Sequence, residues 1–427
     1  MDTVASKRAL LIAFHYPPMR GSSGLQRALT FGNQLPDFGW QTTIVTAHPR
    51  AYPDTSADQL ADIDPRVRVL RAQCWDAARH LSLAGRYPRL LATPDRWASW
   101  LPFGLATVLR EIRRRRPQVI WSTFPIPTAH SIAAAAARIS GLPWVADFRD
   151  SMTEENYPSD PRVRRVYRGI ERRVIERASA LVFTAPSTLR MYDERYPGKR
   201  SPLWSVVGNG FDERKFDLAA SRSAVQTVGS IGVQKWLHSG LLDPVDRDPS
   251  EFFRAVRALK QQGVISTDKV AIVLRASGHD ATYAPLLEQH GIADLVTLAP
   301  PIPYADALEE MLHADALLLF QARNCNHQIP AKLYEYIRAQ RPVLCLTDPN
   351  GDTAREALSA GIARTVDLHN EAELRAVLGD FATGRIAATT LVAAASAVSR
   401  YSRRGQCELL ATLFDRVAAG SPATAGT

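Results

Sequence analysis

Several features that define common protein classes are missing from this 427-residue sequence. Its four cysteines are scattered without a CxxC pair, which argues against a zinc site or a disulfide framework and predicts reduced thiols. The patterns GxGxxG, Walker A and GxSxG are absent, so a nicotinamide cofactor, a P-loop and a serine hydrolase are disfavoured. No apolar run is long enough to cross a membrane, and the first residues contain no signal-peptide core. We therefore expect a cytoplasmic protein.

Lysine is scarce as well. It supplies only 7 of the 52 basic residues, and arginine supplies the other 45. Arginine suits phosphate recognition because its planar guanidinium can bind two oxygens at once. Residues 1–210 hold 30 basic and 18 acidic residues, a net charge of +12, whereas residues 211–427 hold 22 and 25, a net charge of −3. A basic half joined to a nearly neutral half indicates an anionic surface or substrate on one side only.

Short apolar runs alternate with stretches of helical periodicity along the chain. Such alternation predicts an α/β fold with parallel sheets covered by helices on both faces. The runs form two series, which predict two doubly wound domains that face each other across a cleft, over residues 1–210 and 233–401, with residues 211–232 as a linker. The expected strands are 8–14, 41–47, 118–124, 143–148, 180–185, 204–209, 270–276, 295–300, 316–322 and 342–347.

Unusual residues follow several of these strands, at the sheet edge where ligands bind in doubly wound folds. The sequence GSSG (21–24) lies between the first strand and the first helix, and its backbone N–H groups suit an anion. An ordinary strand–helix turn explains it equally. The sequence DFRD (147–150) closes another strand with two carboxylates around an arginine. A buried structural ion pair is the alternative explanation for that segment.

One lysine breaks a local rule. Pro330 suits the first position of a helix, which puts Lys332 in the first turn, where the helix dipole disfavours a cation. An anion held at this helix start would satisfy both the free N–H groups and the ammonium. Glu335 lies one turn further on the same face and would accept hydrogen bonds from hydroxyls attached to that anion. A diphosphate followed by a ribose has this arrangement; a solvated Lys–Glu pair is the alternative.

Four segments, in order, resemble the family 4-like glycosyltransferases of the GT-B fold, of the kind found in bacterial exopolysaccharide and O-antigen assembly. The matching segments are HYPPMRGSSGLQRALTFGNQLPDFGWQTTIVTA, PWVADFRD, VVGNGFD and IPAKLYEYIRAQRPVL. The resemblance implies two Rossmann-like domains, of which the first takes the acceptor and the second a nucleotide-diphosphate sugar. It also implies that a last helix, residues 402–417, crosses back to the first domain.

The resemblance assigns roles to individual residues. The donor side takes Gly24, Arg247, Arg275, His327, Ile329, Lys332, Leu333 and Glu335, the last of these as the ribose-binding glutamate. The acceptor side takes Gly21, Ser22, Ser23 and Arg149, and the catalytic set is Asp147, Asp150 and Lys332. Lys332, Arg275 and Arg247, in that order, are expected to bind the diphosphate. His327 departs from the pattern, because the family often has a sugar-binding glutamate at that position.

The implied reaction is sugar transfer with retention of the anomeric configuration, without a metal or another cofactor. The expected partners are the nucleotide-sugar donor, a glycan or lipid-linked acceptor and an anionic membrane surface, and no nucleic acid. The membrane expectation rests on residues 161–179, whose seven arginines interrupt an apolar helical face; a helix packed on the sheet explains them as well. Two alternatives stay open: a sugar-nucleotide 2-epimerase of the same fold, and a non-catalytic nucleotide-sugar-binding subunit.

Overall fold

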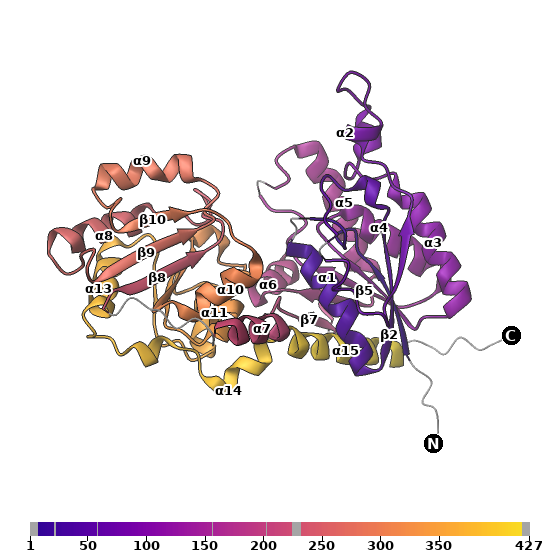
Figure 1. Ribbon diagram of the computed structural model, residues 1–427. Helices are drawn as coiled ribbons and strands as arrows, with labels where there is room; N and C mark the ends of the chain where they lie inside the picture. The colour runs from indigo at the N-terminus through magenta and orange to yellow at the C-terminus, as the bar shows by residue number, and fades with distance from the viewer. Residues whose placement is uncertain are drawn as a thin grey trace. The chain divides into compact units, whose positions relative to one another are not determined.

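The computed structural model describes residues 7–20, 23–57, 59–155, 157–201, 203–223 and 232–420. The chain divides into two compact units (Figure 1). The first comprises Met1–Gly208 and Gln406–Thr427, and the second comprises Asn209–Gly405. Within the described ranges, no helix combines the length and the apolar character that crossing a membrane requires.

The first unit is built on a seven-stranded sheet in which every pairing is parallel. The strand order is β3-β2-β1-β4-β5-β6-β7, so the direction of winding reverses between β1 and β4. The strands are β1 (Lys7–Ile12), β2 (Trp40–Ala47), β3 (Arg68–Ala72), β4 (Val119–Thr123), β5 (Trp144–Phe148), β6 (Ala180–Phe183) and β7 (Trp204–Val206). The helices are α1 (Ser23–Gln34), α2 (Ala77–His80), α3 (Trp100–Arg115), α4 (Pro127–Ser140), α5 (Pro161–Arg177), α6 (Pro186–Arg195) and α15 (Arg403–Ala419).

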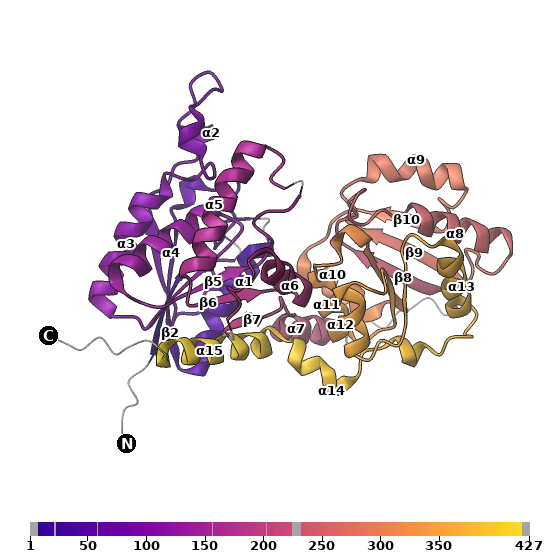
Figure 2. The ribbon, with the colours of Figure 1, turned by 180° about the vertical axis from the view of Figure 1, so that it is seen from behind.

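Side chains of β1 alternate between two hydrophobic cores, one on each face of the sheet, because successive strand residues point to opposite sides. Leu10 and Ile12 join the core covered by α3, α4, α5 and α6. Ala9 and Leu11 join the core covered by α1 and by the C-terminal helix α15 (Figure 2). Phe414 of α15 packs edge-on against Trp40, with 5.5 Å between ring centroids. The end of the chain therefore completes the core of the first unit.

The second unit repeats the plan with six parallel strands in the order β10-β9-β8-β11-β12-β13, and the winding reverses between β8 and β11. The strands are β8 (Gln234–Ser239), β9 (Val270–Arg275), β10 (Val296–Ala299), β11 (Ala316–Gln321), β12 (Val343–Thr347) and β13 (Thr365–Val366). The helices are α7 (Glu213–Ser223), α8 (Ser250–Gln261), α9 (Asp280–His290), α10 (Tyr304–His313), α11 (Ala331–Ala339), α12 (Asp352–Ser359), α13 (Glu371–Ala382) and α14 (Ala395–Val398).

The two ends of the second unit lie beside each other. Phe211 N–H donates to the Tyr401 carbonyl at 3.1 Å, and Arg403 N–H donates to the Phe211 carbonyl at 2.8 Å. On the first unit's side of the same junction, Gly208 N–H donates to the Gln406 side chain at 2.6 Å. The outgoing and returning segments are thus hydrogen-bonded to each other within each unit.

The predicted α/β fold is confirmed, and every strand expected from an apolar run is present with ends within three residues. Three strands were missed. β3 is interrupted by arginines, β8 begins with polar residues, and β13 has only two residues. The expected linker 211–232 was wrong over part of its length, because residues Glu213–Ser223 form helix α7 and its Phe216 is fully buried.

A buried ion pair joins α1 to the centre of the first sheet. Nε and Nη2 of Arg27 donate to the two carboxylate oxygens of Asp147 at 2.8 and 2.9 Å. Arg27 also donates to the carbonyls of Gly208 at 2.8 Å and Val207 at 3.0 Å, and Thr123 Oγ1 donates to Asp147 at 3.0 Å. Both charged side chains are almost completely buried. The pair therefore fixes α1, β4, β5 and the segment after β7 relative to one another.

Removing one partner of this pair should destabilise the first unit strongly. In Asp147→Ala the Arg27 guanidinium stays buried without its carboxylate, so we expect the free energy of unfolding to fall by about 3–5 kcal/mol. Urea unfolding followed by tryptophan fluorescence measures this fall, because seven of the eight tryptophans lie in the first unit. The control is Asp193→Ala, which removes an exposed pair with Arg200 worth about 0.2–1 kcal/mol. Equal losses in the two variants would contradict the role of the buried pair.

Candidate functional site

The site of interest in the second unit lies where the winding reverses, at the carboxyl ends of β8 and β11. α11 follows β11 and begins directly after Pro330, one residue later than predicted, and no side chain caps its first turn. Lys332 lies in that first turn, as predicted. The N–H groups at an uncapped helix start attract an anion.

Lys332 lies against the backbone that follows β8. Gly240 has a φ of 129°, a conformation that side-chain-bearing residues rarely adopt, and a Cβ there would overlap Cε and Nζ of Lys332. Glycine is thus required twice at this position, for its backbone angle and for the space that the lysine occupies. The close approach holds the ammonium at the carboxyl end of β8.

Lys332 has a second cation and one carboxylate in its surroundings. Burial lowers the pKa of its ammonium and the charge of Arg247 lowers it further, while Glu335 opposes the shift. Arg247 lies in the loop between β8 and α8 and is half-buried. Within the described part of the chain, neither the Lys332 ammonium nor the Arg247 guanidinium forms an ion pair or hydrogen bond. Two neighbouring cations repel each other, Glu335 is the one acid that acts on Lys332, and a diphosphate would compensate the remaining positive charge.

Glu335 lies one helical turn beyond Lys332 and is held by α10. Tyr304 donates its hydroxyl to Glu335 Oε1 at 2.7 Å. The ammonium of Lys215, on α7, lies 5.5 Å from the centroid of the Tyr304 ring and attracts its face. Glu335 Oε2 accepts no hydrogen bond from any described residue, so this oxygen is free for a ligand hydroxyl.

The loop between β11 and α11 is fixed by a buried amide. Gln321 Nε2 donates to the carbonyls of Cys325 at 2.8 Å and Gln328 at 3.0 Å, and Thr353 Oγ1 donates to the same Gln328 carbonyl at 3.0 Å. His327, in this loop, is half-buried and its Nε2 lies 3.3 Å from the Gln328 amide. These bonds hold the segment that leads into the helix start.

Two residues assigned to the donor side serve the core instead. Ile329 is 7% exposed and Leu333 is fully buried. The Leu333 N–H donates to the Pro330 carbonyl at 3.0 Å, so it is not free for a phosphate. Their side chains anchor α11 and thereby orient Lys332 and Glu335.

Arg275 is not available to bind a diphosphate, contrary to the prediction. It forms a bidentate pair with Glu310 of α10, with nitrogen–oxygen distances of 2.9 and 2.8 Å, and Nη1 donates to the Pro300 carbonyl at 2.9 Å. Lys235 shares the same carboxylate at 3.0 Å. Glu310 therefore neutralises Arg275, and of the three expected cations only Lys332 and Arg247 remain available.

Asp147 is likewise excluded from contact with a sugar. Its side chain is fully buried in the pair with Arg27, which is the structural alternative stated for the DFRD segment. Asp150 is 46% exposed and pairs with Arg149 Nη2 at 2.8 Å. Of the two predicted catalytic carboxylates, only Asp150 is accessible.

Arg149 lies with Gly24 and His15 at the carboxyl ends of β5 and β1. A Cβ on Gly24 would overlap Arg149 Nη1 and would lie 3.1 Å from His15 Nδ1. Burial, together with the charge of Arg149, lowers the pKa of His15 to about 4, so the ring is neutral at pH 7. Gly21 and Ser22 lie outside the described residues, as does the Ser23 side chain. Gly24, assigned to the donor side, and Arg149, assigned to the acceptor side, thus lie next to each other.

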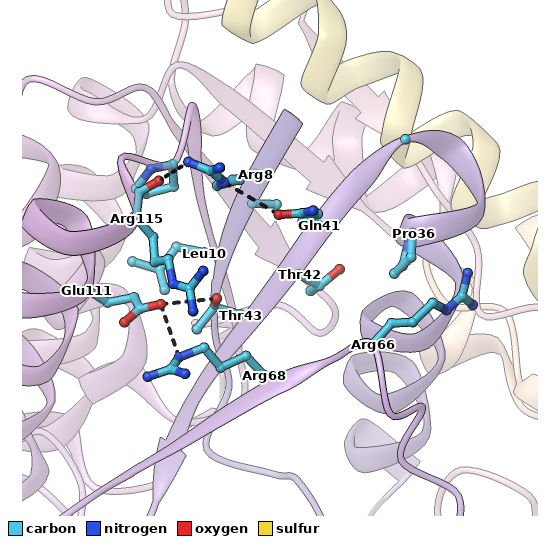
Figure 3. A pocket seen from close by; sticks show the side chains of 13 residues that line it. Arg8, Leu10, Pro36, Gln41, Thr42, Thr43, Arg66, Arg68, Glu111 and Arg115 are labelled. Carbon is cyan, nitrogen blue, oxygen red and sulfur yellow. Dashed lines mark hydrogen bonds and ion pairs between the residues drawn. The ribbon is translucent and has the colours of Figure 1, made fainter. Parts of the chain in front are cut away.

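A large cavity of about 540 Å³ lies elsewhere in the first unit, at the amino ends of β1, β2 and β3. Glu111 lies within the cavity, where it accepts a hydrogen bond from Thr43 at 3.4 Å and pairs with Arg68 at 3.3 Å (Figure 3). Arg8, which also lines the cavity, donates a hydrogen bond to the Arg115 carbonyl. Ligands of doubly wound sheets bind at the opposite ends of the strands. This cavity is therefore distinct from the predicted site.

Four residues of these two sites escaped the sequence analysis: Arg27, His15, Gly240 and Tyr304. Arg27 lies among the apolar helix positions Leu25, Ala28 and Leu29. An arginine beside such an apolar face was the only sequence feature that could have indicated a buried charge. Gly240 follows a strand that the pattern did not reveal. Tyr304 carries no sequence signal, because its partner Glu335 lies on another helix. Among the described residues, no group of three or more His, Cys, Asp or Glu side chains is placed to hold a metal ion.

Two doubly wound parallel sheets of this order, with a last helix in the first unit, define the GT-B fold. Solved structures support this class. A sucrose-phosphate synthase from Thermosynechococcus elongatus has a TM-score of 0.65 at 14% identity, covering 97% of this chain and 100% of that one. Anabaena HepE in complex with UDP-glucose has a TM-score of 0.62 at 15% identity, covering 96% and 99%. A putative UDP-N-acetylglucosamine 2-epimerase from Listeria monocytogenes has a TM-score of 0.53 at 14% identity, covering 95% of both.

A family match covers most of the first unit. Residues 24–210 match the family described as glycosyl transferase 4-like domain. The first unit of this GT-B chain is therefore similar to the family that the resemblance named. No curated protein matches the sequence.

The close approach of Gly240 and Lys332 predicts a specific substitution effect. In Gly240→Ala the new Cβ displaces the ammonium, so we expect the affinity for pyrophosphate to fall at least about tenfold, a loss of about 1.4 kcal/mol. Titration calorimetry measures this affinity. The control is Gly263→Ala, which also has a positive φ but has no atom within 4 Å of the new Cβ. If both variants bind pyrophosphate like the parent, Lys332 does not hold the anion.

Proposed function

We propose that this protein is a retaining glycosyltransferase that moves a sugar from a nucleotide-diphosphate sugar to a glycan or lipid-linked acceptor in bacterial surface polysaccharide biosynthesis. The observation that carries the proposal is the presence of two cations, Lys332 and Arg247, that form no ion pair or hydrogen bond with any described residue, beside the uncapped start of α11. The family match of residues 24–210 supports it. The GT-B structures that contain UDP or UDP-glucose support a nucleotide-sugar donor.

Each part of the donor has a partner in the second unit. The diphosphate takes Lys332, Arg247 and the first N–H groups of α11. The ribose hydroxyls donate to the free carboxylate oxygen of Glu335, whose other oxygen is oriented by Tyr304. The donor sugar lies nearest the loop that carries His327, and an imidazole there replaces a carboxylate as the hydroxyl partner.

The chemical step depends on the departing diphosphate. As the bond from the anomeric carbon to the phosphate oxygen breaks, its electron pair passes to that oxygen and negative charge grows there. Lys332, Arg247 and the helix start stabilise this charge, in place of a metal ion. The acceptor hydroxyl attacks from the face that the diphosphate leaves and gives its proton to the leaving oxygen, which retains the configuration. Asp150 and Arg149 are proposed to orient the acceptor.

We also place the enzyme at the inner face of the plasma membrane. Helix α5 packs Tyr167, Ile170 and Val174 against the first sheet, and its outer face carries six exposed arginines: Arg162, Arg165, Arg168, Arg172, Arg173 and Arg177. A basic surface of this kind binds anionic headgroups. A lipid-linked acceptor would be presented there.

A non-catalytic nucleotide-sugar-binding subunit is the second candidate, and the occurrence of His327 in place of a glutamate favours it. Donor binding is shared by both candidates, so turnover separates them. An epimerase would convert the nucleotide sugar without an acceptor, which a donor-only incubation analysed by NMR detects.

Two substitutions should separate donor binding from bond breaking. Glu335→Ala removes charge-assisted hydrogen bonds worth about 1.5–3 kcal/mol each, so donor affinity should fall about tenfold to a few hundredfold. Lys332→Ala should lower kcat more than it weakens binding, because its charge matters most as the diphosphate leaves. Calorimetric binding of UDP-glucose and related donors, together with steady-state kinetics, measures both effects.

The controls are Glu288→Ala and Lys269→Ala, which remove exposed charges of the same kind elsewhere in the second unit. Both should bind and turn over like the parent. If Glu335→Ala and Lys332→Ala also behave like the parent, the pair is a solvated helix surface and the donor site lies elsewhere.

The stereochemistry and the metal requirement form a separate prediction. We expect transfer to continue in the presence of EDTA, because Lys332 and Arg247 supply the positive charge, and we expect the product to keep the donor's anomeric configuration. NMR of the product's anomeric proton determines its configuration, and an activity assay with chelator tests the metal requirement. An inverted product, or activity lost with EDTA and restored by a divalent ion, would disprove this mechanism.

A further inference from the structure

Residues 77–94 project from the first unit around α2 in both views (Figures 1 and 2). This segment, called the 77–94 hairpin here, carries large apolar side chains on its outside. Leu83 is 86% exposed and Leu90 is 82% exposed. Leu81 and Leu91 are exposed as well. Such a group of leucines in water is costly unless something covers it.

The tip of the 77–94 hairpin is an ordered turn. Leu83 N–H donates to the Arg86 carbonyl at 2.8 Å, and Arg86 N–H donates to the Leu83 carbonyl at 3.0 Å. Ala84 and Gly85, between them, have φ angles of 50° and 74°, as a type I′ turn requires. The backbone groups that flank the tip are therefore paired, which favours entry into an apolar medium.

The base of the hairpin is fixed to the first unit. Asp76 accepts two hydrogen bonds from Arg96, at 2.7 and 2.5 Å, and Ala77 N–H donates to the Arg96 carbonyl at 2.8 Å. Arg79 donates to the Tyr52 carbonyl. The segment is thus closed at its two ends by a bidentate pair, and the exposure of its leucines is a built feature of the fold.

The charge of the hairpin has one sign only. Residues 77–94 contain Arg79, Arg86 and Arg89 and no acidic residue. The flanking carboxylates do not offset this charge at the surface, because Asp76 is buried against Arg96, and Asp95 is buried and accepts hydrogen bonds from the Thr128 N–H and hydroxyl.

The hairpin adjoins the arginine-rich outer face of α5. The Arg162 N–H lowers the pKa of Asp160, the residue before α5, and the charge of Arg89 lowers it further. Arg89 therefore lies near the start of α5. The hairpin arginine Arg89 and the first exposed arginine of α5, Arg162, thus both lie near Asp160.

We propose that the 77–94 hairpin is a membrane anchor, in which Leu83 and Leu90 enter the interface of an anionic bilayer while Arg86, Arg89 and the arginines of α5 bind its headgroups. Apolar insertion and basic attraction are each weak alone, and together they give stable attachment. A protein partner would cover the leucines equally well, but it does not call for a hairpin whose charged side chains are all basic. The inference deepens the membrane location proposed above and is independent of sugar transfer.

The first test is partition of the full chain onto vesicles of phosphatidylcholine with phosphatidylglycerol, measured by flotation. In Leu83→Ser/Leu90→Ser we expect the partition coefficient to fall at least about tenfold. In Arg86→Glu/Arg89→Glu we expect loss of the preference over pure phosphatidylcholine vesicles. The control is Leu218→Ser/Leu409→Ser, which removes two exposed leucines on α7 and α15 and should partition like the parent. An equal fall in the control, or none in Leu83→Ser/Leu90→Ser, would overturn the proposal.

A label at the tip tests insertion directly. All four native cysteines are buried, so Ala84→Cys accepts an environment-sensitive fluorophore selectively. We expect its emission to shift to the blue on anionic vesicles, whereas a label at Asp268→Cys, an exposed position in the second unit, should not shift. Binding without a shift at residue 84 would contradict insertion. A sedimentation change in Leu83→Ser/Leu90→Ser with unaltered vesicle binding would instead identify a second copy as the occupant.

Donor binding distinguishes failure of this proposal from failure of the proposed function. Leu83→Ser/Leu90→Ser should bind UDP-glucose like the parent, and Lys332→Ala should bind vesicles like the parent. Each proposal can therefore fail while the other holds.

Discussion

The position of the ion pair between Arg27 and Asp147 determines how the first unit is assembled. Its four hydrogen bonds from the guanidinium reach a carboxylate at the centre of the sheet and two carbonyls at the end of the last strand. An arginine and an aspartate buried together cost desolvation, which only such complete pairing offsets. The pair therefore constrains α1, and with it the Gly24 end of the helix beside Arg149 and His15. The position of these residues therefore depends on a buried contact within the unit.

The second unit is organised by a steric constraint instead. Gly240, which follows β8 and has a positive φ, leaves space for Lys332. The loop after β11 is held by hydrogen bonds from Gln321, and it determines where α11 begins. Both strands border the point where the winding reverses. Lys332 forms no ion pair there with any described residue, and a positively charged side chain at a helix start is disfavoured by the helix dipole. Such a departure from a local rule is expected at functional sites.

The sequence predicted the parts of this arrangement that leave a local trace. β11 and β12 are buried runs of apolar residues, and Lys332 contradicts the preference of a helix start, so both were found from neighbouring residues alone. Contacts between distant segments leave no such trace. Arg275 follows a strand end as a phosphate-binding arginine would, and only the fold shows that Glu310 neutralises it. Asp147 and Asp150 look alike in DFRD, yet one is buried and the other exposed. β8 was missed because its first residues are polar, and Gly240 was missed with it.

The hydrogen bonds between Phe211 and the segment Tyr401–Arg403 have a consequence for how such a chain can be rebuilt. The second unit is one continuous insertion in the first unit, and its first and last residues lie side by side. It can therefore be exchanged as a whole without changing the connectivity of the first unit. Recombination between related chains at these two points would join a new second unit to an existing first unit in one event. The junction thus offers a route by which the properties of the two units can diversify independently.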